Sequence, residues 1–201
     1  MTPSLVVIFG LPGAGKSYVA EVLHAHFRYT VYDGDRDIPQ NMKDALFQKK
    51  EITDVMRREF LDNMITSIRT LSETHEKLAA HQTFLKEFMR KKIFDAFPYA
   101  KFILVETDDA IREQRYMKRD YFNLGLGYLR HMCSLFEQPR ILHSVIKNNT
   151  DGTTDVIKQL QKVFMVSSIV KIPITIYLLI SLAIVPHIDI IGANVVRGAH
   201  R

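Results

Sequence analysis

The sequence has little cysteine and no block of like charge. Its 201 residues include a single cysteine, Cys133, so the chain cannot build a disulfide framework of its own. That composition fits a reducing compartment, and we expect a cytoplasmic protein. No five consecutive charges share a sign, and the basic residues behind the formal charge of +5 are spread along the chain. We therefore expect no nucleic-acid partner, because arginines that bind phosphate groups explain the excess equally well.

Signals for export and for metal binding by histidine are also missing. No basic region precedes the apolar residues 5–9, and that stretch is too short for a secretory signal. The eight histidines show no spacing typical of metal ligands, and His24 and His26 would project from different sides of a helix. The composition, 47% hydrophobic and 24% charged, is instead that of a globular domain that buries its core without disulfides.

A glycine-rich segment near the start of the sequence matches the phosphate-binding pattern G-x-x-x-x-G-K-[ST] in full. It follows the apolar run 5–9, which predicts a strand buried on both faces, and precedes residues 18–27, which have helical spacing. A strand, a tight loop and a helix in that order form the context that the pattern requires, whereas a turn that binds nothing would not need its lysine and serine together. The predicted nucleotide-binding residues of this P-loop are Gly10, Leu11, Pro12, Gly13, Ala14, Gly15, Lys16 and Ser17.

The fixed positions of the P-loop each have a chemical reason. Glycine lets backbone N–H groups turn toward an anion, and the N-terminus of the following helix adds further unpaired N–H groups. We expect Lys16 to bring positive charge to the β- and γ-phosphates of ATP as a catalytic residue, and Ser17 to ligate Mg²⁺.

Strands and helices alternate along the rest of the sequence. The alternation predicts an α/β fold, a P-loop domain with a parallel sheet of about five strands sandwiched by helices. Further strands are expected at residues 29–32, 78–81, 101–106 and 141–146, of which 78–81 has the weakest signal. Helices are expected at 53–71, 84–94, 109–119 and 153–164, and a loop at Gly125 and Gly127.

Two carboxylates follow the second expected strand, in Asp33-Gly34-Asp35. Because the carboxyl ends of parallel strands face the ligand crevice of an open sheet, both would lie beside a bound triphosphate. Asp33 would then hold Mg²⁺, and Asp35 would orient or deprotonate the hydroxyl group of an acceptor as a catalytic residue. The alternative is a simple Asx turn, since Asp and Gly are ordinary turn residues.

Several segments, taken in order, resemble the gluconokinase branch of the P-loop small-molecule kinases, with shikimate and adenylate kinases as more distant relatives. After the P-loop and the acidic turn, residues 53–57 (TDVMR) are similar to T-D-x-x-R, and residues 84–90 (FLKEFMR) are similar to A-L-K-x-x-x-R. Residues 135–139 (LFEQP) are similar to Q-F-x-x-L-E-x-P, and the resemblance covers roughly residues 4–164. It implies an ATP- and Mg²⁺-dependent kinase of carbohydrate metabolism that phosphorylates a small, gluconate-like molecule.

The resemblance also implies roles for basic side chains. Arg57, Lys86 and Arg90 would face the acceptor. Arg115 and Arg119 would belong to a lid over ATP, with Arg119 covering the γ-phosphate as a catalytic residue. Phosphoryl transfer needs mainly positioning and positive charge, which supports these roles independently. The alternative for the two lid arginines is a solvated, charged helix face.

The acceptor half departs from the family pattern more than the ATP half does. Ile38 stands where the family usually has a histidine before proline, and residues 120–122 lack the usual glycine and histidine of the lid. Another acceptor such as shikimate is therefore an alternative. An alternative of a different class is a nucleotide-binding protein without transfer activity that acts as a membrane-tethered or partner-binding module. Retention of Lys16, Ser17, Asp33 and Asp35 opposes that alternative.

The kinase-like domain is expected to span residues 1–164, followed by a hydrophobic C-terminal tail, 165–201. Residues 172–188 contain no Asp, Glu, Lys or Arg and reach the lower limit of a membrane span, about 17 residues, although Pro173 and the adjacent Asp189 oppose a spanning helix. Three alternatives stay open: a membrane contact through 172–188, a segment that packs on the domain or a partner, and a segment without stable structure. The oligomeric state is also open, with a homodimer as one alternative.

Overall fold

The computed structural model describes residues 4–118, 124–150 and 152–169. The chain divides into two units, Met1–Val163 and Phe164–Arg201, and the sheet belongs to the first. No helix in the described part is long and apolar enough to cross a membrane. Residues 172–188 lie outside the described residues, so their membrane contact and the boundary at residue 164 stay predictions.

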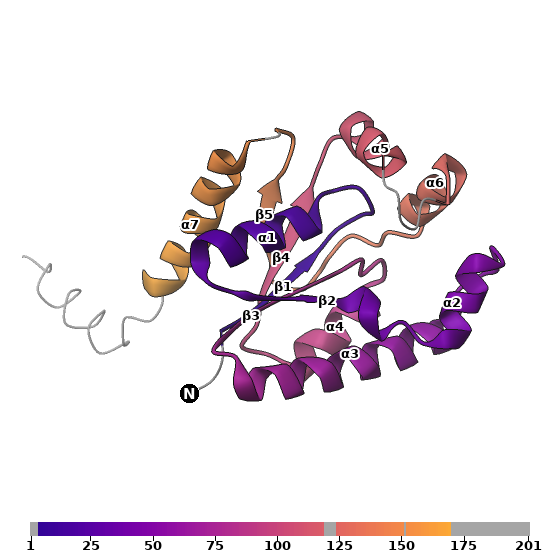
Figure 1. Cartoon of the computed structure of the whole chain (residues 1–201), viewed down its shortest axis with the longest axis horizontal. Coiled ribbons are helices and arrows are strands. Elements are labelled where there is room, and N and C mark those ends of the chain that lie inside the picture. Colours follow the sequence, from indigo (N-terminus) through magenta and orange to yellow (C-terminus); the bar gives the residue numbers. More distant parts are fainter. Residues whose placement is uncertain (1–3, 119–123, 151, 170–201) are drawn as a thin grey trace, which may run out of the picture. The chain divides into compact units, whose positions relative to one another are not determined.

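A five-stranded parallel sheet forms the centre of the first unit (Figure 1), as the sequence predicts. The strand order is β2-β3-β1-β4-β5, with β1 (Ser4–Phe9) in the middle. Residues 5–9 are all buried because helices cover both faces of the sheet, and this is why their sequence is continuously apolar. The other strands are β2 (Thr30–Asp33), β3 (Lys77–Gln82), β4 (Lys101–Glu106) and β5 (Ser144–Lys147).

The strand with the weakest sequence signal, β3, lies between β1 and β2. Its middle residues, Ala79 and Ala80, are small, and its carboxyl end places the polar side chains of His81 and Gln82 in buried positions. An interior strand of small and polar residues has a weak apolar pattern, although it is as buried as its neighbours. The polar end of β3 marks the place where the sheet meets the candidate site.

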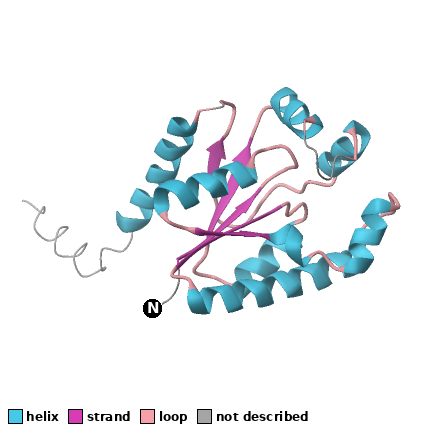
Figure 2. Cartoon of the chain, in the orientation of Figure 1, coloured by secondary structure: helices cyan, strands magenta, loops and turns pink. Residues whose placement is uncertain are grey.

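Helices cover both faces of this sheet (Figures 1 and 2). On one face lie α1 (Lys16–Phe27) and the first turns of α7 (Thr153–Ile169), and on the other lie α3 (Asp54–Thr74) and α4 (Glu87–Ala96). Phe60, Met64 and Ile68 recur at helical spacing along α3 and belong to the main core cluster with the sheet. The carboxyl ends of β2 and β4 lead into the remaining helices, η1 (Gly34–Asp37), α2 (Gln40–Phe47), α5 (Asp109–Met117) and α6 (Leu126–Ser134).

The structure corrects the sequence prediction at α6. The predicted loop at Gly125 and Gly127 is wrong at its second residue, since Gly127 lies in the first turn of this helix. Gly125, with φ of 86°, is the residue that precedes the helix. Burial of Leu129 outweighs the poor helix propensity of Gly127, which is about 1 kcal/mol relative to alanine.

Arg90 is wholly buried and joins α4 to the segment that precedes β5. Its Nη1 and Nη2 donate to the backbone carbonyls of Phe84 and Glu137, both at 2.7 Å, and its Nε donates to the Glu87 carboxylate at 2.6 Å. The same carboxylate accepts the backbone N–H groups of Arg140 and Ile141. The predicted contact of Arg90 with the acceptor is therefore not supported, because each guanidinium nitrogen already donates to the protein.

We expect Arg90→Met to lower the free energy of unfolding by about 3 kcal/mol, because it removes the charged partner of the partly buried Glu87 carboxylate and the guanidinium donor of two carbonyls. Lys91→Met is the control, since Lys91 pairs with Asp95 at the exposed surface, where such pairs contribute less than about 1 kcal/mol. Urea denaturation of both variants makes the comparison. Equal stability of the two variants would contradict the structural role of Arg90.

Candidate functional site

Two side chains from neighbouring loops hold the P-loop at the carbonyl of Ala14. The hydroxyl group of Thr107 and the side-chain amide of Asn148 both donate to it, each at 2.9 Å. Thr107 follows β4 and Asn148 follows β5, so the loops after two neighbouring strands fix the P-loop together. The Thr107 hydroxyl also lies 3.1 Å from the Asn148 carbonyl, which ties these two loops to each other.

Two positions of the P-loop require glycine because other atoms of the protein lie where a Cβ would be. At Gly15, φ is 92°, and a Cβ would collide with the Nδ2 atom of Asn148. At Gly10, φ is 152°, and a Cβ would lie 2.5 Å from the carbonyl oxygen of Val105. Packing within the protein therefore demands glycine at both positions, apart from any contact with phosphate.

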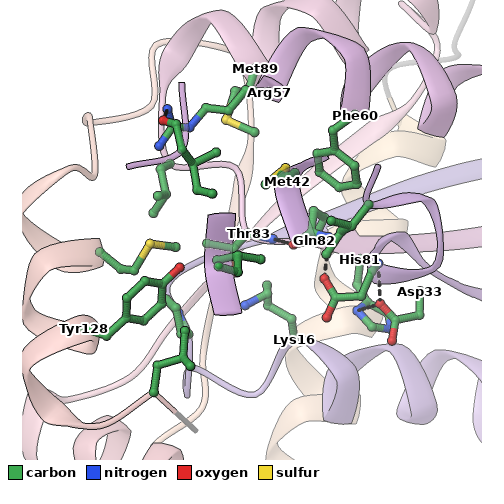
Figure 3. Close-up of a pocket in the computed structure, with 18 of the residues that line it drawn as sticks. Lys16, Asp33, Met42, Arg57, Phe60, His81, Gln82, Thr83, Met89 and Tyr128 are labelled. Carbon is green, nitrogen blue, oxygen red and sulfur yellow. Dashed lines mark hydrogen bonds and ion pairs between the residues drawn. The ribbon is translucent and has the colours of Figure 1, made fainter. Parts of the chain in front are cut away.

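Lys16 is the first residue of α1 and lines a cavity beside the P-loop (Figure 3). Its side chain is largely buried, and its Nζ donates to the carbonyl of Leu11 at 3.1 Å. The first turn of α1 contains no acidic residue, so no carboxylate of that turn offsets the positive end of the helix dipole. A lysine and a helix N-terminus at one place form a suitable site for an anion.

The cavity has a volume of about 650 Å³, within the usual range for small-molecule sites. Lys16 and Ser17 line it after β1, Asp33 lines it at the end of β2, and Asp35 lines it just beyond that strand. His81 and other residues at the end of β3 lie between these two groups, since β3 separates β1 from β2 in the sheet. The structure therefore brings the predicted P-loop and the predicted acidic turn to one cavity.

The acidic turn has a defined internal geometry. Asp33 accepts the backbone N–H of Asp35 at 3.0 Å, which is the Asx turn that the sequence left as an alternative. Asp35 accepts a hydrogen bond from the side-chain amide of Gln82 at 2.8 Å. A Cβ on Gly34 would lie 2.8 Å from Met64 and 3.1 Å from this same amide. Glycine between the two aspartates thus lets Gln82 reach Asp35.

Sequence reasoning missed two polar residues of the site, His81 and Gln82. His81 is buried, and its Nδ1 lies 3.9 Å from an oxygen of Asp33. Burial, assisted by the nearby charge of Lys16, lowers the pKa of His81 against the opposing effect of Asp33. The neutral imidazole is therefore favoured. Two adjacent polar residues at the end of an otherwise apolar strand were the available signal.

The oxygen donors at the cavity suit Mg²⁺, although they are few. Among the described residues, no three side chains of His, Cys, Asp or Glu gather as a metal site. The Ser17 hydroxyl and the Asp33 carboxylate nevertheless line the same cavity as Lys16. Mg²⁺ in nucleotide sites is held by one or two protein oxygens, with phosphate oxygens and water as its other ligands. The donor set is therefore compatible with the predicted magnesium role of Ser17 and Asp33.

Arg57 and Lys86, the two other basic residues predicted to face the acceptor, meet at the start of α3. Thr53 caps this helix by accepting the N–H of Met56 at 3.3 Å, and Arg57 donates to Asp54 at 3.2 Å and to the carbonyl of Ile52. Lys86 donates to the same Asp54 carboxylate at 2.7 Å, and this hydrogen bond lowers the pKa of Asp54. Arg57 lines the cavity, whereas Lys86 does not.

The predicted lid residues are described only in part. Arg119 lies outside the described residues. Arg115 donates to the carbonyl of Asn148 at 2.6 Å and to that of Thr150 at 3.4 Å. In this arrangement it links α5 to the loop that holds the P-loop, and its contact with ATP stays a prediction.

We expect Gly15→Ala to weaken Mg-ATP binding at least tenfold, because the added methyl group displaces Asn148 and strains the backbone by about 1–2 kcal/mol. Isothermal titration calorimetry measures the affinity. Gly127→Ala is the control, since a Cβ there meets nothing within 4 Å, and it should bind as the wild type does. Equal affinity of the two variants would show that the P-loop shape does not depend on this glycine.

Several solved structures share this fold. A sugar kinase from Janibacter sp. aligns with a TM-score of 0.68 and 16% identity, over 80% of this chain and 93% of its own. A gluconokinase from Sinorhizobium meliloti aligns with a TM-score of 0.65 and 19% identity, over 81% and 94%. An APS kinase from Mycobacterium tuberculosis, solved with AMPPNP and APS, aligns with a TM-score of 0.54 and 21% identity, over 79% and 99%. The predicted fold class is confirmed.

No curated protein matches the sequence. Residues 6–123 match a family described as an AAA domain, and this stretch is more than half of the chain. It contains the P-loop, the acidic turn and the strands β3 and β4. The chain therefore belongs to this AAA domain family and has the fold of the P-loop small-molecule kinases.

Proposed function

We propose that this protein transfers the γ-phosphoryl group of ATP to a hydroxyl group of a small molecule. The observation that carries the proposal is the cavity that Lys16, Ser17 and Asp35 line together. The first two belong to a nucleotide-binding pattern, and the third is a carboxylate able to accept a proton. Nucleotide binding alone would not require a carboxylate that Gln82 orients toward this cavity.

Each residue has a role that follows from its chemistry. Lys16 and the P-loop N–H groups hold the phosphates, and Ser17 and Asp33 would hold Mg²⁺, which neutralises charge on the phosphate oxygens when bound. Asp35 orients the acceptor hydroxyl and takes its proton as the new P–O bond forms. Gln82 is a positioning residue, since it fixes Asp35 by the 2.8 Å hydrogen bond. Arg115 and Arg119 stay the predicted lid, with Arg119 over the γ-phosphate.

The sequence resemblance makes gluconate the first acceptor to test, followed by shikimate. The full-length protein is incubated with Mg-ATP and one candidate at a time, and ADP release is measured. Release that depends on an acceptor supports the kinase function. Tight Mg-ATP binding without ADP release for any candidate would support the nucleotide-binding module instead.

We expect Lys16→Ala to raise the Kd for Mg-ATP at least tenfold, because it removes the side-chain cation of the P-loop from the phosphates. Lys158→Ala, at an exposed position of α7, is the charge-matched control and should bind as the wild type does. Calorimetric titration of both variants with Mg-ATP decides between them. Wild-type affinity in Lys16→Ala would refute the assigned role.

We expect Asp35→Asn to lower kcat about a hundredfold or more, with less than a threefold change in the Kd for Mg-ATP. An amide cannot take the proton of the acceptor, but it preserves the size of the side chain. Asp95→Asn, at the surface of α4, is the control and should keep full turnover. Steady-state ADP release and calorimetry supply the two numbers. If turnover and the affinity for Mg-ATP fall by the same factor, Asp35 acts on the nucleotide and not on the acceptor.

A further inference from the structure

We propose that the acceptor is an alcohol with an apolar body, and not a polyol such as a sugar acid. This inference rests on the proposed kinase function, because it concerns the part of the same cavity that receives the acceptor.

The polar side chains of the P-loop, the acidic turn and the end of β3 lie together at one end of the cavity. Lys16, Gln82, His81 and Asp33 are grouped near the P-loop and the strand ends (Figure 3). Other described residues that line the cavity lie outside the P-loop, the acidic turn and the end of β3. Among them, only Arg57 and Lys118 are charged. A ligand in this cavity therefore meets one polar end, where transfer would occur, and an extended, largely apolar wall that also carries the Arg57 guanidinium.

The apolar wall is built by several helices together. α2 supplies Met42 and Leu46, α3 supplies Phe60, α4 supplies Met89, and α6 supplies Tyr128 and Met132. The wall continues into a small core cluster in which Leu46 packs with Ala45 and Ile52, with Tyr128 against it. Burial raises the pKa of Tyr128 to about 12, in keeping with surroundings poor in water. These contacts make the wall a packed surface and not a set of scattered side chains.

A polyol would bind weakly against this wall. Each hydroxyl buried against methionine, leucine or phenylalanine without a partner would weaken binding by about tenfold. The guanidinium of Arg57, whose Nη1 donates to Asp54 and to the carbonyl of Ile52, could pair with one anionic group, which would still leave the other hydroxyls of a polyol against the apolar side chains. An apolar body instead gains affinity from the wall, and three methionines let the wall adapt to its shape.

Primary alcohols of increasing length test the proposal. Binding of 1-butanol, 1-hexanol, 1-octanol and gluconate to the full-length protein is measured by calorimetry with AMPPNP and Mg²⁺ present. We expect affinity to rise about fourfold for each added CH₂ group, because each buries a further methylene. We expect gluconate to bind more weakly than 1-hexanol. ADP release with ATP is measured in parallel for the same compounds.

Two variants make the test specific to the cavity. Met42→Gln and Met132→Gln keep the side-chain size but add a polar group to the wall, so each should weaken 1-octanol binding by about fivefold or more. Met165→Gln is the matched control, since Met165 is 64% exposed, and it should bind as the wild type does. Thermal unfolding confirms that each variant is folded before its affinity is compared.

The outcomes separate this inference from the kinase function. Tighter binding of gluconate than of 1-hexanol, no binding of any alcohol, or no effect of both wall variants would overturn the apolar acceptor. Chain-length-dependent binding without ADP release would support the apolar site and overturn the kinase function. ADP release that rises with chain length and falls in Met42→Gln and Met132→Gln would support both.

Discussion

The site depends on two hydrogen bonds that end on the carbonyl of Ala14. They come from Thr107 and Asn148, which follow β4 and β5, so the strand order itself determines where the P-loop lies. Gly15 has no Cβ because Asn148 occupies that space, and Arg115 attaches α5 to the same loop. Loss of either donor would leave this carbonyl with one partner in place of two and weaken the hold on the P-loop. The fold therefore shapes the anion site before a nucleotide arrives.

A second constraint is the burial of polar groups at the carboxyl edge of the sheet. β3 lies between the strand that precedes the P-loop and the strand that precedes the acidic turn, and its last residues contact that turn. Gln82 orients Asp35, and the buried, neutral His81 lies beside Asp33. Such buried groups cost stability unless they are paired. We infer that their hydrogen-bonding and electrostatic partners in the acidic turn offset this loss of stability. We also infer that catalysis uses the position of Asp35 that results.

Much of the fold and of the candidate site was predictable from the sequence. The apolar run before the P-loop and the alternation of strands and helices identified the five-stranded sheet. The P-loop lysine and the two aspartates were predicted to meet because the carboxyl ends of parallel strands share an edge, and they line one cavity. The structural role of Arg90 and the assembly of the apolar wall were not predictable in this way. The arginine has its partners at Glu87 and Glu137, and the second of these lies far along the chain. Residues of α2 and α6 become one wall only when the chain folds.

The central claim is that one cavity receives both the nucleotide phosphates and an acceptor hydroxyl. Phosphorus NMR of the full-length protein, with Mg-ATP and a mixture of sugar acids and apolar-bodied alcohols, tests it most directly. We predict that the γ-phosphate resonance of ATP falls while a new phosphate monoester resonance and ADP appear in equal amounts. The same sample with Lys16→Ala should show neither. Formation of inorganic phosphate alone, or unchanged ATP with protein that binds it tightly, would contradict the account.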